Sequence, residues 1–191
     1  MTDVNKSQQV MTYVMARPKI KTGDLIAVRG KSGVFAQLVR LVTNSAYTHT
    51  GIAIWLKDQN GEKGLYVAEE DGVKNVYTPL SQYAEDEFDV FRMPVMAKNA
   101  RIQSLFQDTV HEIQDAMRDR IQYSWWQILR IGVYKLVRIT LPGSRRGMVC
   151  SGFSAAIYRE LGWNPVDLAN PPAPSDLTAA LGMPSICVRA L

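Results

Sequence analysis

Residues 48–55 read Thr-His-Thr-Gly-Ile-Ala-Ile-Trp, and this stretch decides most about the fold. β-Branched and aromatic side chains favour a strand here, and Gly51 is the residue that weakens it. Turn-forming residues follow at 58–61, and residues 65–69, Leu-Tyr-Val-Ala-Glu, resume the strand pattern. The sequence therefore predicts two neighbouring strands joined by a turn, with His49 at the entrance of the first strand.

Further elements are expected on both sides of this hairpin. Short apolar runs predict strands at 25–28, 73–77, 88–93 and 185–188. Helical spacing and capping residues predict helices from Ser32 onward, over 99–118, over 124–138, from Ser151 to Leu161, and from Ser175 to Gly182. No repeat or linker divides the chain, so we expect an N-terminal extension at 1–18 and one domain at 19–191.

Composition excludes several classes of protein. A chain of 191 residues can bury a core without disulfides, and its two cysteines cannot build a disulfide scaffold. A formal net charge of +4 is too small for a dedicated nucleic-acid-binding protein. The first 21 residues lack the apolar run of a signal peptide, which predicts a cytoplasmic location and leaves delivery elsewhere or association with a virion open. Basic residues interrupt the apolar segment 121–141, so no transmembrane helix is expected.

Cys150 is the stronger candidate nucleophile of the two cysteines. It lies in Met-Val-Cys-Ser-Gly-Phe at 148–153, immediately before a predicted helix. The unpaired N–H groups and partial positive charge of a helix N-terminus stabilise a thiolate and can hold an oxyanion. The small residues Ser151 and Gly152 leave room for a substrate. Taken alone, a free cysteine is more often a small buried hydrophobic residue, and Cys187 fits that interpretation.

His49 is the candidate base, because a position at the start of an apolar strand holds a side chain rigidly at a sheet edge. The alternative is a structural histidine of the strand whose ring is satisfied by a hydrogen bond. A Cys–His pair usually needs a third group to orient the imidazole. Glu69 and Glu70 end the neighbouring strand and alternate between its faces. We expect Glu69 to orient His49, because it shares a face with Val67, and Glu70 is the alternative.

Metal and cofactor sites are not expected. The two histidines and two cysteines show no paired ligand spacing, and His111 fits the polar side of a helix. Gly30-Lys31-Ser32 resembles the end of a phosphate-binding loop but lacks the glycine five residues earlier. The sequence predicts neither a metal nor a cofactor.

The motifs together resemble the permuted NlpC/P60-like amidases, the YiiX/YaeF type of papain-like protein. The matching segments are Gly23–Ile26, Thr48–Ile54, Tyr66–Glu69, Cys150–Phe153, Tyr123-Ser124 and Pro174–Leu177. The resemblance covers about residues 20–182, with the histidine strand first and the cysteine helix last, as in the permuted group. Family members commonly have Ser-Glu after the cysteine, Tyr-Asp at 123–124 and Glu-Ala at 69–70, where this chain has Ser-Gly, Tyr-Ser and Glu-Glu.

The resemblance implies an α+β, circularly permuted papain-like fold, with a small antiparallel sheet packed on the helix that bears Cys150. It implies a cysteine peptidase or amidase that cleaves a cell-wall peptide or another amide through a Cys150–His49–Glu69 site and a thioester intermediate. The backbone N–H of Cys150 would be the oxyanion donor, with Tyr123 beside it, and Ser151 would lie beside the substrate.

Two other functions remain open at this point. One is a lipid-acting thioesterase or acyltransferase, suggested by the aromatic, aliphatic and basic residues at 124–141, which could touch a membrane surface or an acyl chain. A buried core or lid helix is the alternative for that segment. The other function is a binding domain without turnover, against which the presence of both Cys150 and His49 counts.

Overall fold

The computed structural model describes residues 9–29, 40, 45–57, 60–70, 75–93, 108, 150–163 and 172–190. Apart from residues 40 and 108, the predicted helices beginning at Ser32, over 99–118 and over 124–138 lie outside these ranges. The strands are β1 (Gln9–Met11), β2 (Leu25–Val28), β3 (His49–Lys57), β4 (Lys63–Glu70), β5 (Asn75–Pro79), β6 (Phe88–Phe91) and β7 (Ile186–Val188). The helices are α1 (Tyr13–Ala16), α5 (Cys150–Glu160) and α6 (Pro174–Leu181), with short 3-10 helices η1 (Arg17–Lys19) and η2 (Leu80–Tyr83).

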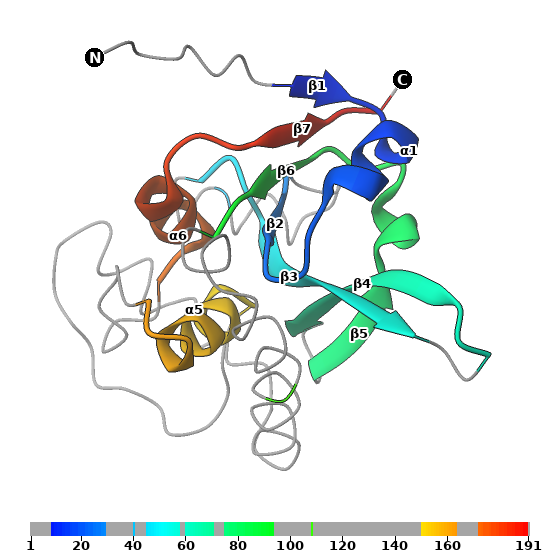
Figure 1. The fold of residues 1–191 in the computed structure, drawn as a ribbon. Helices are drawn as coiled ribbons and strands as arrows, with labels where there is room; N and C mark the ends of the chain where they lie inside the picture. Colours follow the sequence, from blue (N-terminus) through cyan, green and yellow to red (C-terminus); the bar gives the residue numbers. More distant parts are fainter. Residues whose placement is uncertain are drawn as a thin grey trace, which may run out of the picture.

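The described strands form one sheet in the order β1-β7-β6-β2-β3-β4-β5 (Figure 1). Neighbouring strands are antiparallel except for β1 and β7, which are parallel. The α+β class is as predicted, but the expected small antiparallel sheet is wrong in detail. Over the described residues, the sheet has seven strands and is mixed.

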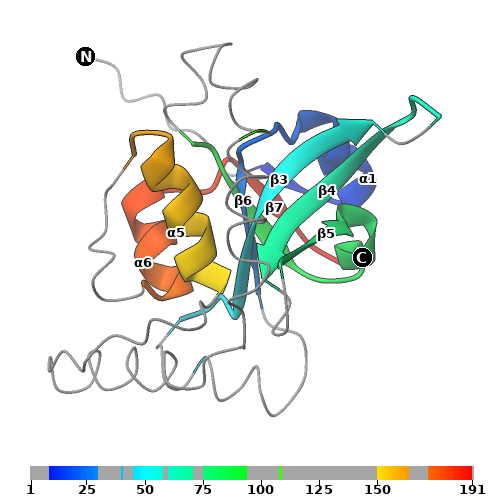
Figure 2. The same cartoon turned by 90° about the horizontal axis from the view of Figure 1, so that it is seen from below.

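Both faces of the sheet are buried, and the alternation of side chains explains how. Leu25, Ala27, Ile52 and Ile54 face α5, where they pack against Phe153 and other residues of that helix. The intervening residues, among them Ile26, Val28 and Ala53, pack on the opposite face with residues of α1 and η2. Figure 2 shows α5 and α6 together on one side of the strands.

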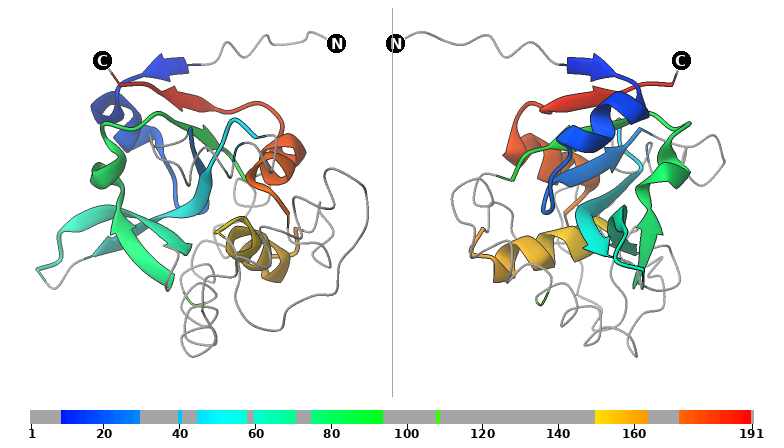
Figure 3. Two further views of the ribbon diagram at one scale, coloured as in Figure 1. Left: turned by 180° about the vertical axis from the view of Figure 1, so that it is seen from behind. Right: turned by 45° about the vertical axis from the view of Figure 1, so that its right-hand side comes forward.

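The N-terminal residues 9–18 belong to the fold, contrary to the predicted extension at 1–18. Residues Gln9–Met11 pair with Ile186–Val188, so that β1 and β7 join the two ends of the described chain (Figure 3). Ala16 and Ile20 are buried in the core opposite α5. The sequence prediction failed here because three residues carry too little periodicity to indicate a strand, and a partner 177 positions away in the chain supplies the pairing.

The helix that begins with Cys150 ends as predicted. Gly162 follows its last turn with a φ of +83°, a conformation that glycine adopts easily, and the N–H of Trp163 donates to the carbonyl of Tyr158. The start of α6 differs from the prediction. Ala173, rather than Ser175, precedes the helix, because Pro174 fills its first turn and the Asp176 carboxylate accepts the N–H of Ala173 at 2.9 Å.

Gly51 allows β3 and β4 to approach closely beside the candidate site. A Cβ atom at this position would overlap Cγ1 of Val67 and lie 3.1 Å from Cβ of Glu69. A larger residue would therefore push β4, and Glu69 with it, away from the strand that carries His49.

Among the described helices, none is long and apolar enough to cross a membrane.

Candidate active site

Cys150 is the first residue of α5, which begins one residue before the predicted start at Ser151, and Cys150 is half-buried. It forms a hydrogen bond with the imidazole of His49 and accepts the backbone N–H of Thr50. Residues Cys150 and His49 each begin their own element, a helix and a strand. The site therefore lies where the helix N-terminus meets the start of β3.

His49 bridges Cys150 and Glu69. Its Nε2 atom lies 2.7 Å from Oε2 of Glu69, and the side chains of His49 and Glu69 are 23% and 3% exposed. An ionised carboxylate can only accept, so Nε2–H is the donor in this bond. The other ring nitrogen, Nδ1, is then the one that faces the Cys150 thiol.

The charges of the three groups stabilise one another. Burial alone would lower the pKa of His49, but the Cys150 thiolate and the Glu69 carboxylate outweigh it and raise that pKa above its ordinary value. Burial would also raise the pKa of Cys150, yet the imidazolium of His49 and the N–H of Thr50 lower it. Both shifts favour a thiolate–imidazolium pair at neutral pH.

Glu69 is held by two further residues that the sequence did not point to. The hydroxyl of Tyr83 donates to Oε2 of Glu69 at 2.8 Å, and the side chain of Thr78 also forms a hydrogen bond with this carboxylate. Burial opposes ionisation of Glu69, but its bonds to His49, Thr78 and Tyr83 lower its pKa. No sequence period links Tyr83 to Glu69, because residues 71–74 and the strand β5 separate them in the chain.

Glu70, the alternative to Glu69, is also buried, but the carboxylate that binds Nε2 of His49 is that of Glu69. By alternation along β4, Glu70 points toward the α5 side, and its negative charge acts on Cys150 by raising the pKa of that thiol. The alternation argument from the sequence therefore chooses the residue that contacts His49. Both carboxylates are buried at the end of β4.

The two residues predicted to lie beside the substrate have different outcomes. Tyr123 lies outside the described residues. Ser151 is buried, and its hydroxyl donates to the carbonyl oxygen of Pro172 at 2.5 Å. Its side chain therefore ties the start of α5 to the segment before α6, and a place for Ser151 beside the substrate stays a prediction.

Cys187 has the structural environment that the sequence suggests. It is buried in β7 and lies opposite Asp89 of β6, whose carboxylate raises the pKa of the thiol together with burial. Asp89 in turn is bound by Arg29, Tyr47 and Arg189. The Cys187 thiol thus lies beside a carboxylate that is already hydrogen-bonded to three other side chains, none of which is His49.

The comparisons with known proteins concern the fold. No family model matches the chain, and no curated protein matches it. Among solved structures, the crystal structure of the metalloprotein YiiX from Escherichia coli O157:H7 is similar, with a TM-score of 0.53 and 22% identity over 90% of this chain and 89% of that chain. The chain has a YiiX-like fold.

This similarity agrees with the α+β architecture and spans nearly the whole of both chains. Within the part of the chain that the structure describes, no three His, Cys, Asp or Glu side chains gather in a way that could hold a metal ion.

Proposed function

We propose that this protein is a cysteine hydrolase of the permuted papain-like, NlpC/P60-related type, which cleaves an amide bond in a peptide, isopeptide or cell-wall peptide. The observation that carries the proposal is the position of the His49 imidazole between the Glu69 carboxylate and a thiol at a helix N-terminus. The order of histidine strand before cysteine helix and the YiiX-like fold support the permuted papain-like relationship.

Cys150 would act as the nucleophile. Nδ1 of His49 holds the proton that leaves the thiol, and Glu69 stabilises the resulting imidazolium through Nε2. The thiolate sulfur attacks the substrate carbonyl, forming a C–S bond and a tetrahedral oxyanion. Collapse breaks the C–N bond, and the leaving amine takes the proton from His49.

Water would complete the cycle. His49 removes a proton from the water molecule as its oxygen attacks the thioester carbonyl, and the C–S bond breaks to release the carboxylic acid. The backbone N–H of Cys150 at the start of α5 is the proposed oxyanion donor, because the N-terminal amides of a helix have no partner within the helix.

The amide substrate is the main proposal, since the resemblance rests on amidase motifs, and an acyl ester is the alternative on the same residues. The segment 124–141 that suggests a lipid substrate lies outside the described residues. The reaction steps are the same for both substrates, with an alcohol instead of an amine as the leaving group.

Turnover by matched cysteine variants tests the proposal. We expect Cys150→Ser to lower hydrolysis of a peptide or ester reporter by several orders of magnitude, and Cys187→Ser, which keeps a small hydrogen-bonding group beside Asp89, to retain it. Equal turnover by wild type and folded Cys150→Ser would refute the proposed nucleophile. Preference between the peptide and ester reporters distinguishes the two substrate classes.

A further inference from the structure

The segment β5–η2 surrounds the Glu69 carboxylate with donors. Thr78 lies on β5, which pairs with β4 along the stretch that ends at Glu69 and Glu70. Tyr83 closes η2, directly after β5, and its side chain is packed in the core opposite α5 beside Val67. Two hydroxyl donors from one continuous segment thus reach the carboxylate from the side away from His49's own strand.

The hydroxyl of Tyr83 is a permanent donor. Burial and the negative charge of Glu69 raise the pKa of Tyr83 well above its ordinary value, so the hydroxyl keeps its proton throughout the working pH range. It binds the same oxygen, Oε2, that accepts Nε2–H of His49. One carboxylate oxygen therefore sits between a tyrosine O–H and an imidazole N–H, and its position is fixed from both sides.

We propose that Tyr83 is a positioning residue of the site: its hydroxyl holds Oε2 of Glu69 where it accepts Nε2–H of His49 and keeps Nδ1 turned toward Cys150. Thr78 is the second donor in this arrangement. The reaction that this positioning serves rests on the proposed function, but the orientation of His49 does not. Without the two hydroxyls, the Glu69 side chain could rotate, and the imidazole would lose its fixed acceptor.

This inference predicts effects that a purely structural tyrosine would not produce. A less fixed carboxylate stabilises the imidazolium less, so the thiolate–imidazolium pair forms only at higher pH. We expect Tyr83→Phe to raise the pH midpoint of Cys150 alkylation by iodoacetamide and to slow alkylation at pH 6 on the order of tenfold, as a shift of one pKa unit requires. Where turnover is measured, kcat falls and KM stays near the wild-type value.

Tyr158→Phe is the matched control. Tyr158 is another buried tyrosine, its hydroxyl donates to the carbonyl of Gly23 at 3.1 Å, and it packs in the core cluster on the α5 side of the sheet, whereas Tyr83 packs in the opposite one. Its loss removes a comparable hydrogen bond from the core without touching the site. We expect Tyr158→Phe to change stability but neither the alkylation midpoint nor the spectrum of His49.

The second readout is the ¹⁵N spectrum of the imidazoles, which is simple because the chain has two histidines, His49 and His111. The proposal predicts that Tyr83→Phe and Thr78→Val shift the His49 nitrogen resonances from those of an imidazolium toward those of a neutral imidazole, and that Thr78→Ser restores the wild-type spectrum. Should Tyr83→Phe fail to fold, the Thr78 pair carries the test.

Unchanged His49 resonances and alkylation midpoints in the folded variants would overturn the inference, and so would equal changes in Tyr158→Phe. The two proposals can fail separately. A wild-type protein that hydrolyses no acyl substrate contradicts the proposed function, whereas the spectrum of His49 still decides whether Tyr83 positions Glu69.

Discussion

Nε2 of His49 lies 2.7 Å from Oε2 of Glu69, and the adjacent carboxylate of Glu70 belongs to the other face of the same strand. The two glutamates therefore act on the thiol of Cys150 with opposite signs. Glu69 stabilises the imidazolium that lowers the pKa of Cys150, whereas the charge of Glu70 raises that pKa directly. Neighbouring carboxylates of equal chemistry thus provide a paired test of the site.

Neutralising each glutamate in turn should move the reactivity of Cys150 in opposite directions. Glu69→Gln keeps an acceptor for His49 but loses the charge, so turnover should fall by about ten- to hundredfold, the value of one charge-assisted hydrogen bond. Its alkylation midpoint should rise. Glu70→Gln should lower the midpoint instead, because it removes a negative charge that opposes the thiolate. The pH midpoint of each variant is obtained from the rate of iodoacetamide labelling between about pH 4 and about pH 9, which covers the range of thiolate pKa values. Midpoints that shift in the same direction in both variants would contradict this account.

The chemistry should also depend on pH as a coupled pair. The pKa of Cys150 is lowered and that of His49 is raised. Hydrolysis should therefore begin to rise at a pH below the pKa of an ordinary thiol, and it should decline only at a pH above the pKa of an ordinary histidine. The two limbs of a kcat/KM profile report this directly. A single rise near about pH 8.5, the value of an unperturbed cysteine, would indicate a thiol without its imidazolium.

Gly51→Ala should damage both stability and activity. The added methyl would meet Val67 and the Cβ of Glu69 at distances that require β4 to move. We expect a loss of about 1–3 kcal/mol in the free energy of unfolding, the usual cost of overpacking, and lower turnover because Glu69 moves with its strand. Gly61→Asn is the control, since nothing lies near that position and asparagine tolerates its positive φ. Urea denaturation and turnover, measured together, test this prediction. Unchanged stability and turnover in Gly51→Ala would show that β3 and β4 can separate freely.

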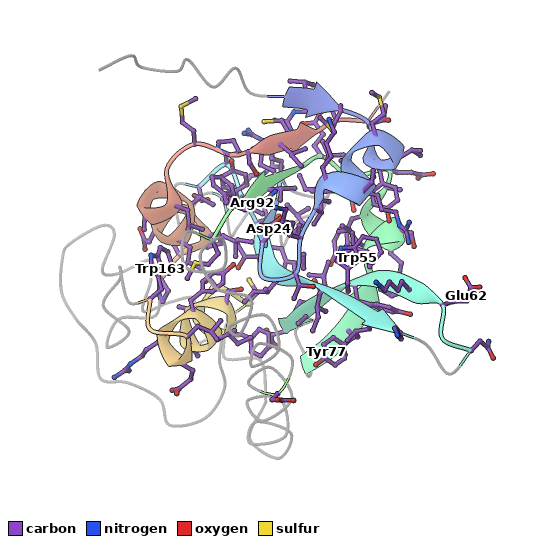
Figure 4. The ribbon with its side chains drawn as sticks, viewed as in Figure 1. Asp24, Trp55, Glu62, Tyr77, Arg92 and Trp163 are labelled. Carbon is purple, nitrogen blue, oxygen red and sulfur yellow. The ribbon has the colours of Figure 1, made fainter. Side chains whose placement is uncertain are left out.

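Asp24 should make stability fall as pH rises through the acid range. This carboxyl lies beside Arg92 in the core, as Figure 4 shows, and Nε of Arg92 is 3.1 Å from its Oδ1. Burial raises its pKa from 3.8 to about 6 despite the N–H of Lys21 and the charge of Arg92. Because the folded state then binds the proton more tightly than the unfolded chain, the wild type loses up to about 3 kcal/mol between about pH 4 and about pH 6.

Asp24→Asn removes this loss, so the stability of the variant relative to wild type should increase across the same interval and level off above it. Asp89→Asn is the control of opposite sign. Burial opposes the ionisation of Asp89, but Arg29, Tyr47 and Arg189 lower its pKa. The ionised Asp89 carboxylate therefore stabilises the folded state above the pKa of the unfolded chain, and this stabilisation is lost as pH falls. Urea titrations at several pH values give both difference curves, and parallel curves for Asp24→Asn and wild type would show that its pKa is not raised.

The sequence predicts the centre of the sheet and the residues of the site because local patterns encode them. The strands β2, β3 and β4 have short runs of apolar residues, α5 begins at a cysteine followed by small residues, and alternation on β4 distinguishes Glu69 from Glu70. The short strand β1 could not be predicted, since its stability comes from pairing with the far end of the chain.

Two side-chain roles show the same limit. Ser151 stands beside the nucleophile in the sequence, which suggests a contact with substrate, but its hydroxyl is used by Pro172 in a segment that folds back on the helix. Tyr83 reaches Glu69 from a different element. Contacts between segments distant in the chain leave no period or spacing that a single sequence can reveal.

The central claim is that Cys150 forms a covalent acyl intermediate, and trapping that intermediate tests it most directly. Wild-type protein is mixed with an activated acyl ester, quenched with acid within the first turnover and mapped by peptide mass spectrometry. The account predicts one acyl group on Cys150, released by neutral hydroxylamine as a thioester, with none on Cys187, and slower acylation in His49→Ala. Turnover without any acyl group on Cys150, or turnover retained by folded Cys150→Ser, would contradict it.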